Sequence, residues 1–411
     1  MFPFNVFLLR ISTVVLYHSK NGSKPRLLSM ALLREKVRIP DDLIFCVLAK
    51  LSLKSLKRFE CVHKSWVNIL ENPYFLSMYR NNITSKYDSI NNSSVLLKQF
   101  SVSESPDKLF LLSGNAFENK RKLDWPTPFQ EEKFVFILSS TVVHGMICVH
   151  QGDFRASGLE IPHKIMLWNL TTQQFQLLPS LHIEDCPLGW QISAKVHGFG
   201  YDCLTDDYKV IQCTYYCDPP KGGILWYIYS LRSNSWRKLD IDMPPKVLES
   251  SGFTLYLNGV CHWWGWISPE NWGKAQLYLV SFNLYNEVVV TTHMPFLWGK
   301  NRCYTDHYLD ELNGSIIDIK HDLDAKTIDI FVLGELGVKE SWTKLFTFSP
   351  LPFPGVFIGV TKKRGIVVFL GYEYQDEEIT RFDLRTQVVQ EVGIKGFAPY
   401  CQVETIPGID I

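Results

Sequence analysis

IMLWNLTTQQFQLLP, residues 165 to 179, decides the fold expected for most of this chain. It reads as an apolar strand, a leucine (Leu170), a polar turn and a second strand, which is the pattern of a β-hairpin. The same pattern returns in WYIYSLRSNSWRKLD (226–240), LVSFNLYNEVVVTTHMP (279–295) and ITRFDLRTQVVQEVG (379–393). These copies predict a chain built from repeated hairpins.

Two less regular copies and a second set of turns complete the repeat. An expanded copy surrounds Leu333, and a faint one lies around Leu112 and Phe117. Upstream of most copies stands a glycine turn that predicts another hairpin: His144-Gly145, Asn258-Gly259, Asn313-Gly314 and Arg364-Gly365. Two hairpins per unit, repeating every 50 to 60 residues or so, are typical of β-propeller blades, which bury their sheet faces only against neighbours. We expect about six blades.

A different pattern, RIPDDLIFCVLAKLSLKSLKRFECVHKSWVNILENPYF, occupies residues 38 to 75. Pro40 with two following carboxylates provides the chemistry of a helix start. Apolar residues at helical spacing then predict a first helix, Ser52 is a candidate cap for a second, and Asn72-Pro73 ends it. So small a helical pair leaves apolar surface for a partner, although on periodicity alone the start of a larger helical domain is the favoured interpretation.

The composition is that of a globular protein without a dominant charge. Lys+Arg and Asp+Glu each total 42, so no net field attracts nucleic acid or anionic lipid. The 10 cysteines form no C-x-x-C pair, and reduced buried thiols are expected. Cys213 and Cys217 are the closest pair, and a metal or redox role for them is the minor alternative. We therefore predict no metal and no cofactor.

Residues with catalytic potential have simpler structural interpretations. The sequence contains no G-x-S-x-G, H-E-x-x-H, P-loop or dinucleotide motif. Asp206-Asp207 resembles a carboxylate pair, but adjacent strand residues face opposite ways, so a turn is favoured. His144, His197 and His262 lie in or before strands and are expected to be packed or turn residues rather than ligands.

Tryptophans cluster unusually around residues 263 to 298. On a strand, Trp264 and Trp266 share one face with His262, and Trp263 faces the other side. We expect one set to be core, and the other set, with Trp272 and Trp298, either to line a recognition surface or to be packed as well. Loops converge at the ends of a propeller channel, so the candidate target-binding residues are the loop aromatics Trp190, Trp272, Trp298 and Tyr304.

The order of segments follows from these patterns. Residues 1–29 are an atypical apolar extension that is interrupted by Arg10 and too short before Lys20 for a regular membrane helix. Residues 38–76 are helical, 80–94 form a polar linker, and 95–396 form the β domain. The predicted fold class is multidomain α+β, with a small helical domain followed by an all-β propeller-like domain.

Two families share these motifs. Ile39-Pro40-Asp41-Asp42-Leu43-Ile44, Leu53-Lys54-Ser55-Leu56, Lys64-Ser65-Trp66 and Asn72-Pro73-Tyr74-Phe75 resemble the F-box, with departures at Ser52 and His63. Further blocks resemble the F-box-associated, kelch-like interaction domain of plant proteins: Leu167-Trp168-Asn169 with Leu178-Pro179, His197-Gly198-Phe199-Gly200-Tyr201-Asp202, Tyr229-Ser230-Leu231 with Ser235-Trp236-Arg237, Leu257-Asn258-Gly259-Val260, and Asp383-Leu384-Arg385-Thr386.

The resemblance implies a substrate receptor of a Skp-cullin-F-box ubiquitin ligase, cytoplasmic or nuclear, that catalyses no reaction itself. The F-box would bind a Skp-family adaptor, and through it a cullin, and the β domain would bind a target protein. The expected adaptor-binding residues are Pro40, Leu43, Ile44, Leu48, Leu51, Leu53, Leu56, Phe59, Val62 and Trp66. The alternative is a propeller enzyme or carbohydrate-binding protein with an accessory helical pair.

Overall fold

The computed structural model describes most of the strand-rich part of the chain and a few residues before it. The described residues are 44, 45, 48, 68, 72, 74, 75, 94–100, 107–114, 117–132, 135–151, 154–157, 160, 161, 163–183, 191–217, 223–241, 243, 254–267, 276–295, 305–312, 314–322, 325–349, 356–361, 367–371, 377–383, 388–396 and 402–406. The chain divides into two compact units, Met1–Val47 and Leu48–Ile411, and the second holds all the described strands.

The described residues of the predicted helical pair have helical conformation where helices were expected. Ile44, Leu48 and Asn68 are helical, whereas Asn72 is not. The Asn72 Oδ1 accepts hydrogen bonds from the backbone N–H groups of Tyr74 (2.9 Å) and Phe75 (3.3 Å). Asn72 therefore caps the helical turn that contains Tyr74 and Phe75.

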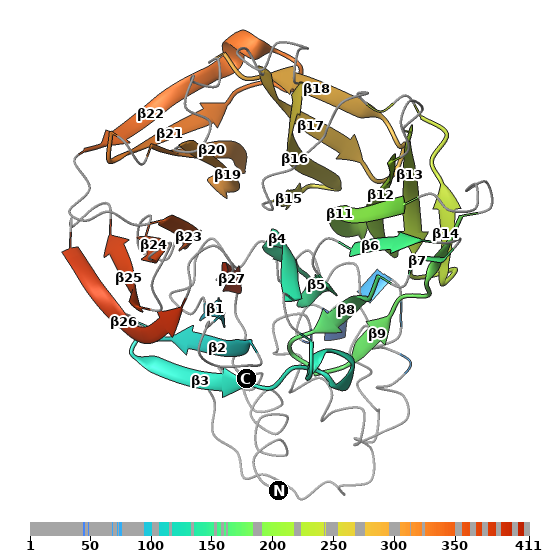
Figure 1. The fold of residues 1–411 in the computed structure, drawn as a ribbon, viewed down its shortest axis with the longest axis horizontal. Coiled ribbons are helices and arrows are strands. Elements are labelled where there is room, and N and C mark those ends of the chain that lie inside the picture. Colours follow the sequence, from blue (N-terminus) through green and yellow to red (C-terminus); the bar gives the residue numbers. More distant parts are fainter. Residues whose placement is uncertain are drawn as a thin grey trace, which may run out of the picture. The chain divides into compact units, whose positions relative to one another are not determined.

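The β domain is a six-bladed propeller, as the repeats predicted. In the described residues, the strands group into six antiparallel blades that follow one another around a ring (Figure 1). The second blade contains β4 (Val135–Val143), β5 (Met146–Gln151), β8 (Ile165–Asn169) and β9 (Phe175–Leu177). The third contains β11 (Gln191–Asp202), β12 (Asp207–Cys217), β13 (Gly223–Ser230) and β14 (Ser235–Lys238), with β6 (Phe154–Ser157) added beside β11.

The next three blades each use four consecutive strands. The fourth contains β15 (Thr254–Leu257), β16 (Val260–Ile267), β17 (Gln276–Asn283) and β18 (Val289–His293). The fifth contains β19 (Thr305–Leu312), β20 (Ser315–Asp322), β21 (Thr327–Leu333) and β22 (Trp342–Phe348). The sixth contains β23 (Val356–Thr361), β24 (Val367–Gly371), β25 (Glu377–Asp383) and β26 (Val388–Gly396). In the part of the chain that the structure describes, short 3₁₀ turns lie at Thr127–Phe129 and Lys339–Ser341.

The first blade is assembled from both ends of the β domain. It contains β1 (Ser94–Gln99), β2 (Lys108–Ser113) and β3 (Asn119–Leu123), and its remaining strand is β27 (Gln402–Ile406). β27 pairs antiparallel with β1, from Ser94↔Ile406 to Lys98↔Gln402. The sheets therefore extend past residue 396, where the repeats predicted the end of the domain. The repeats did not predict β27 because it is an isolated strand outside any repeated hairpin.

The recurring leucines tie the outer hairpin of a blade to its inner hairpin. The backbone N–H of Leu170 donates to Gly145 O at 2.9 Å, and that of Leu284 donates to Gly259 O at 3.0 Å. Leu231 makes the corresponding bond to Tyr208 O at 2.9 Å. Leu170 and Leu284 are fully buried, so at these positions the repeated leucine packs in the core and its backbone N–H joins two turns by a hydrogen bond.

The core lies between blades as well as within them. Trp263 of β16 packs in a cluster with third-blade residues such as Ile211, whereas the adjacent Trp264 packs in a cluster with fifth-blade residues such as Phe331. Adjacent strand residues face opposite sides of a sheet, so both faces of the fourth blade are buried. This is how a propeller removes the apolar faces that a single blade would expose.

A buried ionic contact lies where the first blade meets the second. Lys98 of β1 is fully buried, its Nζ donates to Val135 O at 2.7 Å, and it lies 3.7 Å from the Asp107 carboxylate. The same ammonium lies 4.7 Å from the centre of the Phe136 ring. Burial raises the pKa of Asp107, while the Lys98 charge opposes that rise. Each buried charge is therefore compensated by the other, and removal of either side chain would leave an unpaired charge in the core.

Candidate functional site

The loop aromatics predicted to bind a target cannot be placed. Trp190, Trp272, Trp298 and Tyr304 all lie outside the described residues. Among the predicted adaptor-binding residues, Ile44 is helical and half-buried, and Leu48 is helical with 2% exposure. The remaining ones lie outside the described residues: Pro40, Leu43, Leu51, Leu53, Leu56, Phe59, Val62 and Trp66.

The adjacent tryptophans of the fourth blade are both core residues. Trp263 stacks on Trp226 of the third blade, and Trp264 stacks on Trp342 of the fifth, with ring centroids 5.9 Å apart in each pair. Neither is more than 1% exposed. The packed alternative therefore holds for both faces at these positions, because each face of the blade meets a neighbouring blade. The Trp266 side chain lies outside the described ones.

Asp206 lies in the turn between β11 and β12, and Asp207 is the first residue of β12. Asp206 has a φ of +52° and accepts a hydrogen bond from the Tyr201 hydroxyl. Asp207 accepts from the Arg232 N–H at 2.9 Å and from the Ser230 hydroxyl at 2.5 Å. Both carboxylates accept hydrogen bonds from neighbouring groups, and the turn interpretation holds for Asp206, whereas Asp207 begins the strand.

Asp202, at the same turn, connects two blades. Its Oδ2 accepts from Lys209 Nζ at 2.7 Å, and that ammonium also donates to Leu284 O of the fourth blade at 2.8 Å. Burial by itself would raise the pKa of Asp202, but hydrogen bonds from Lys209, Thr205 and Leu204 more than offset it, so the pKa is lowered. The Asp202 carboxylate thus holds a lysine that reaches across to the next blade.

The three singled-out histidines have packing environments. His144 has a φ of +52° in the turn between β4 and β5, and its ring lies edge-on to Tyr201 at 4.8 Å. His197 is fully buried beside Trp226, with ring centroids 4.9 Å apart, and burial holds its pKa well below the usual value. His262 Nδ1 lies 2.8 Å from the Ser281 hydroxyl, and burial lowers its pKa to about 3. Burial with a lowered pKa is typical of neutral core histidines, which describes His197 and His262, whereas His144 is a half-buried turn residue.

The described cysteines are free thiols. Cys148, Cys213 and Cys261 are buried and Cys203 is exposed. Burial raises the pKa of the Cys213 thiol to about 12, which makes it unreactive at neutral pH. The Cys217 side chain lies outside the described ones. Among the described residues there is no group of three His, Cys, Asp or Glu side chains placed to hold a metal ion.

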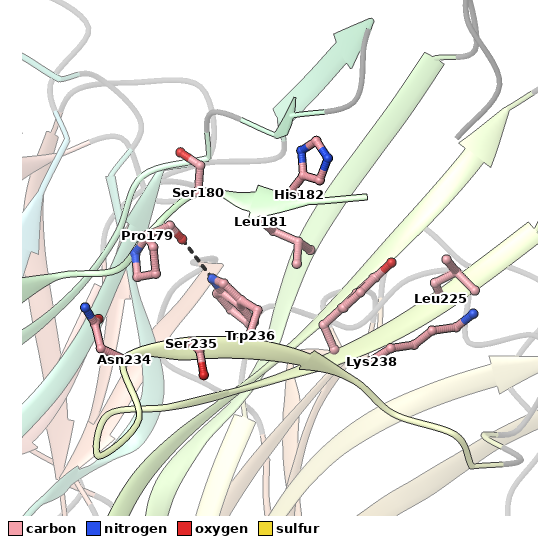
Figure 2. Close-up of a pocket in the computed structure, with 10 residues that line it drawn as sticks. Pro179, Ser180, Leu181, His182, Leu225, Asn234, Ser235, Trp236 and Lys238 are labelled. Atoms are coloured by element: carbon pink, nitrogen blue, oxygen red, sulfur yellow. Dashed lines mark hydrogen bonds between the residues drawn. The ribbon is translucent and has the colours of Figure 1, made fainter. Parts of the chain in front are cut away.

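One pocket is formed by residues that the sequence did not single out as a site. Its cavity volume is about 440 Å³ (Figure 2), and it lies beside β14 at the outer part of the third blade (Figure 1). One wall is the segment from Pro179 to β10 (Leu181–His182), a short strand paired with β7 (Glu160–Ile161). The other wall is the β13–β14 hairpin. The lining residues are Pro179, Ser180, Leu181, His182, Leu225, Tyr227, Asn234, Ser235, Trp236 and Lys238.

Strand register explains why the hairpin presents its aromatics to this pocket. Trp236 pairs directly with Tyr229, and Lys238 pairs with Tyr227. Directly paired residues and every second residue share a face, so these four side chains lie on one face of the blade. Tyr229 is fully buried toward the second blade, whereas Trp236 and Lys238 lie further out on the same face. The pocket therefore lies at the outer end of this face of the third blade.

Trp236 is fixed in place by both walls. Its Nε1 donates to Pro179 O at 2.8 Å (Figure 2). Its ring centroid lies 5.4 Å from that of Tyr229. Leu181 and Tyr227, which pack in one cluster, are 4% and 6% exposed. The opening therefore has a rigid aromatic and aliphatic base, while Ser180, His182, Asn234 and Lys238 at its margin are exposed.

Some of the pocket residues belong to sequence motifs to which no binding role was assigned. Leu178-Pro179 and Ser235-Trp236-Arg237 belong to the blocks that resemble the plant interaction domain. No sequence signal joins them, because they are separated along the chain and meet only when the second and third blades pack.

Comparisons with known proteins agree with this architecture. The model of the F-box associated beta propeller domain matches residues 155–399, and the model of the F-box domain matches residues 37–78. The chain therefore belongs to the family of proteins with an F-box associated beta propeller domain, and it carries an F-box before that domain.

Individual relatives give the same picture. The F-box/kelch-repeat protein At3g23880 of Arabidopsis thaliana is 25% identical over 330 residues, covering 76% of this chain and 80% of the relative. The F-box protein At1g30790 of the same plant is 23% identical over 386 residues, covering 88% and 90%. The superposition on a solved oligogalacturonate lyase in complex with manganese covers 73% of this chain and 78% of the lyase chain, with 9% identity and a TM-score of 0.38. A likeness this weak says nothing about function.

Proposed function

We propose that this protein is the substrate-recognition subunit of a Skp-cullin-F-box ubiquitin ligase. The residues 37–78 bind a Skp-family adaptor, and the propeller binds the protein that is to be ubiquitinated. The observation that carries the proposal is the presence, in one chain, of an F-box match and a complete six-bladed propeller. The propeller supplies a rigid platform, and the ligase machinery supplies the chemistry, so this chain contributes proximity and orientation.

The distribution of perturbed groups supports binding over the alternative of a propeller enzyme. In the described part of the chain, the groups with shifted pKa values include His150, His197, Cys213 and His262, and desolvation by burial is the largest cause for each. None of them lines the pocket. An active site is expected to gather such groups at a cleft, whereas here they are packed between and within blades.

The protein is proposed to act in the cytoplasm or nucleus, where Skp-family adaptors and cullins would meet it. Among the described residues, no helix combines the length and apolar character needed to cross a membrane.

The adaptor assignment is tested by changing Leu51 and Leu56 together to Ala. Both are predicted to belong to the apolar surface that the helical pair leaves uncovered. The double variant should lose co-purification of a co-expressed Skp-family protein and keep the melting temperature of the propeller. A matched control replaces the exposed Leu336 and Val338 of the propeller by Ala and should bind the adaptor normally. Retained co-purification by the Leu51/Leu56 variant would contradict the proposal.

A further inference from the structure

We propose that the pocket between Pro179–His182 and the β13–β14 hairpin binds an extended segment of the target protein in which a large apolar side chain adjoins an acidic residue. This rests on the proposed function, which makes the propeller the target-binding domain. The proposed target-binding site is thus at the outer end of the interface between the second and third blades, and not at the loop aromatics that the sequence predicted.

The base of the pocket fits one large apolar side chain. Leu181, Leu225, Tyr227 and the Trp236 indole supply the apolar surface. The volume of about 440 Å³ lies within the range of roughly 300–1,000 Å³ that is usual for ligand pockets. Because the Trp236 N–H already donates to Pro179 O, the indole presents its ring as a wall and is oriented before any ligand arrives. A preformed aromatic pocket loses little side-chain entropy on binding.

The charge at the margin selects the neighbouring residue. Lys238 lies along the pocket with its ammonium at one end, beside Leu225, and His182 lies above Leu181 (Figure 2). Among the ten lining residues, all of which the structure describes, none carries a carboxylate. Lys238 is exposed, so its ammonium is accessible to a ligand group that approaches from solvent. A carboxylate beside the apolar side chain complements this arrangement.

The adjacent strand favours a polypeptide as the occupant. β14 is the terminal strand of its sheet, and in the described residues its outer edge pairs with no further strand. Such an edge presents backbone N–H and C=O groups to an extended peptide, while alternate side chains of that peptide enter a pocket. Trp236 and Lys238 both come from β14, so the pocket and the free edge belong to one surface.

The experiment uses the full-length chain and immobilised synthetic peptides. Each peptide carries Phe, Leu, Trp or Ala at a central position, flanked by Asp, Ser or Lys. Three variants are compared with the wild type: Lys238→Glu, which reverses the charge; Ser180→Phe, which places a ring at the pocket mouth; and the control Lys122→Glu, which makes the same charge change on the exposed outer strand of the first blade. The best peptide is then titrated in solution by fluorescence anisotropy.

We expect the wild type and Lys122→Glu to retain peptides with an aromatic or leucine beside Asp. Lys238→Glu should weaken the best of them about tenfold at low salt, and this difference should shrink as salt is added. Ser180→Phe should abolish binding. Equal binding by Ser180→Phe, no preference between Asp and Lys flanks, or selection of Ala-centred peptides would each overturn the proposal. Adaptor co-purification is measured on the same samples, so failure of the pocket and failure of the F-box assignment give different results.

Discussion

Replacing Trp263 or Trp264 singly by Ala tests whether both faces of the fourth blade are core. In a sheet with one solvent face, one of two adjacent tryptophans would be exposed, and its removal would change stability little. Here each indole is at most 1% exposed and stacks on a tryptophan of a different neighbouring blade, Trp226 or Trp342. Both substitutions should therefore be costly.

The magnitude follows from the side-chain volume that is lost. Truncating a fully buried tryptophan to Ala costs about 3–5 kcal/mol, because transfer free energy is lost and a cavity remains. For a domain of this size, each kcal/mol lowers the melting temperature by about 2 °C or somewhat more, so each variant should melt roughly 6–10 °C or more below the wild type. The two losses together approach the total stability of a typical domain, about 5–15 kcal/mol, so the double variant is expected not to fold.

The assay is urea unfolding of each single variant, monitored by far-UV circular dichroism, together with thermal melting. Tyr285→Ala is the matched control, since that aromatic side chain is 56% exposed at a turn of the same blade. Its unfolding free energy should lie within about 0.5 kcal/mol of the wild type. If either Trp263→Ala or Trp264→Ala also falls within about 1 kcal/mol of the wild type, the blade has a face that is not packed against a neighbour, and the ring of packed blades described above is incorrect.

Further consequences concern ring closure, pH and the link between blades. Ending the chain at residue 400 removes β27, so β1 loses a partner strand and the truncated protein should be insoluble; a soluble, cooperatively melting product would contradict closure through the first blade. Burial lowers the pKa of His150 and His262 to about 3 and that of His321 to about 4, below the usual value of 6.5. Between the folded-state and the usual pKa values, the unfolded chain therefore binds more protons than the folded chain. The urea midpoint should fall as the pH drops below about 6.5, and it should fall less steeply in His262→Gln. A midpoint that stays constant from pH 7 to 5 would refute this. Lys209→Met removes the bonds to Asp202 and Leu284 O and should lower the unfolding free energy by about 1–3 kcal/mol, whereas Lys326→Met, at an exposed turn, should not.

The sequence by itself predicted about six blades and the outer hairpin of each. Each outer hairpin is joined by a short turn, so its pattern of strand, leucine, polar turn and strand is local and visible in segments such as 165–179 and 226–240. The faint copy around Leu112 and Phe117 corresponds to β2 and β3. The turn at Asp206 was also predicted, because a turn depends on neighbouring residues in the chain.

Only the tertiary structure decided what meets across blades. β27 pairs with β1 from the opposite end of the domain, and a five-residue strand has no local pattern that names its partner. The adjacent Trp263 and Trp264 could be assigned to opposite faces from strand geometry, but only the packing of the third and fifth blades buries both. The pocket arises in the same way, since Pro179 and Trp236 come from different blades and are joined by one hydrogen bond. Hairpin pairing is set by nearby residues, whereas contacts between blades depend on the twist and closure of the whole ring.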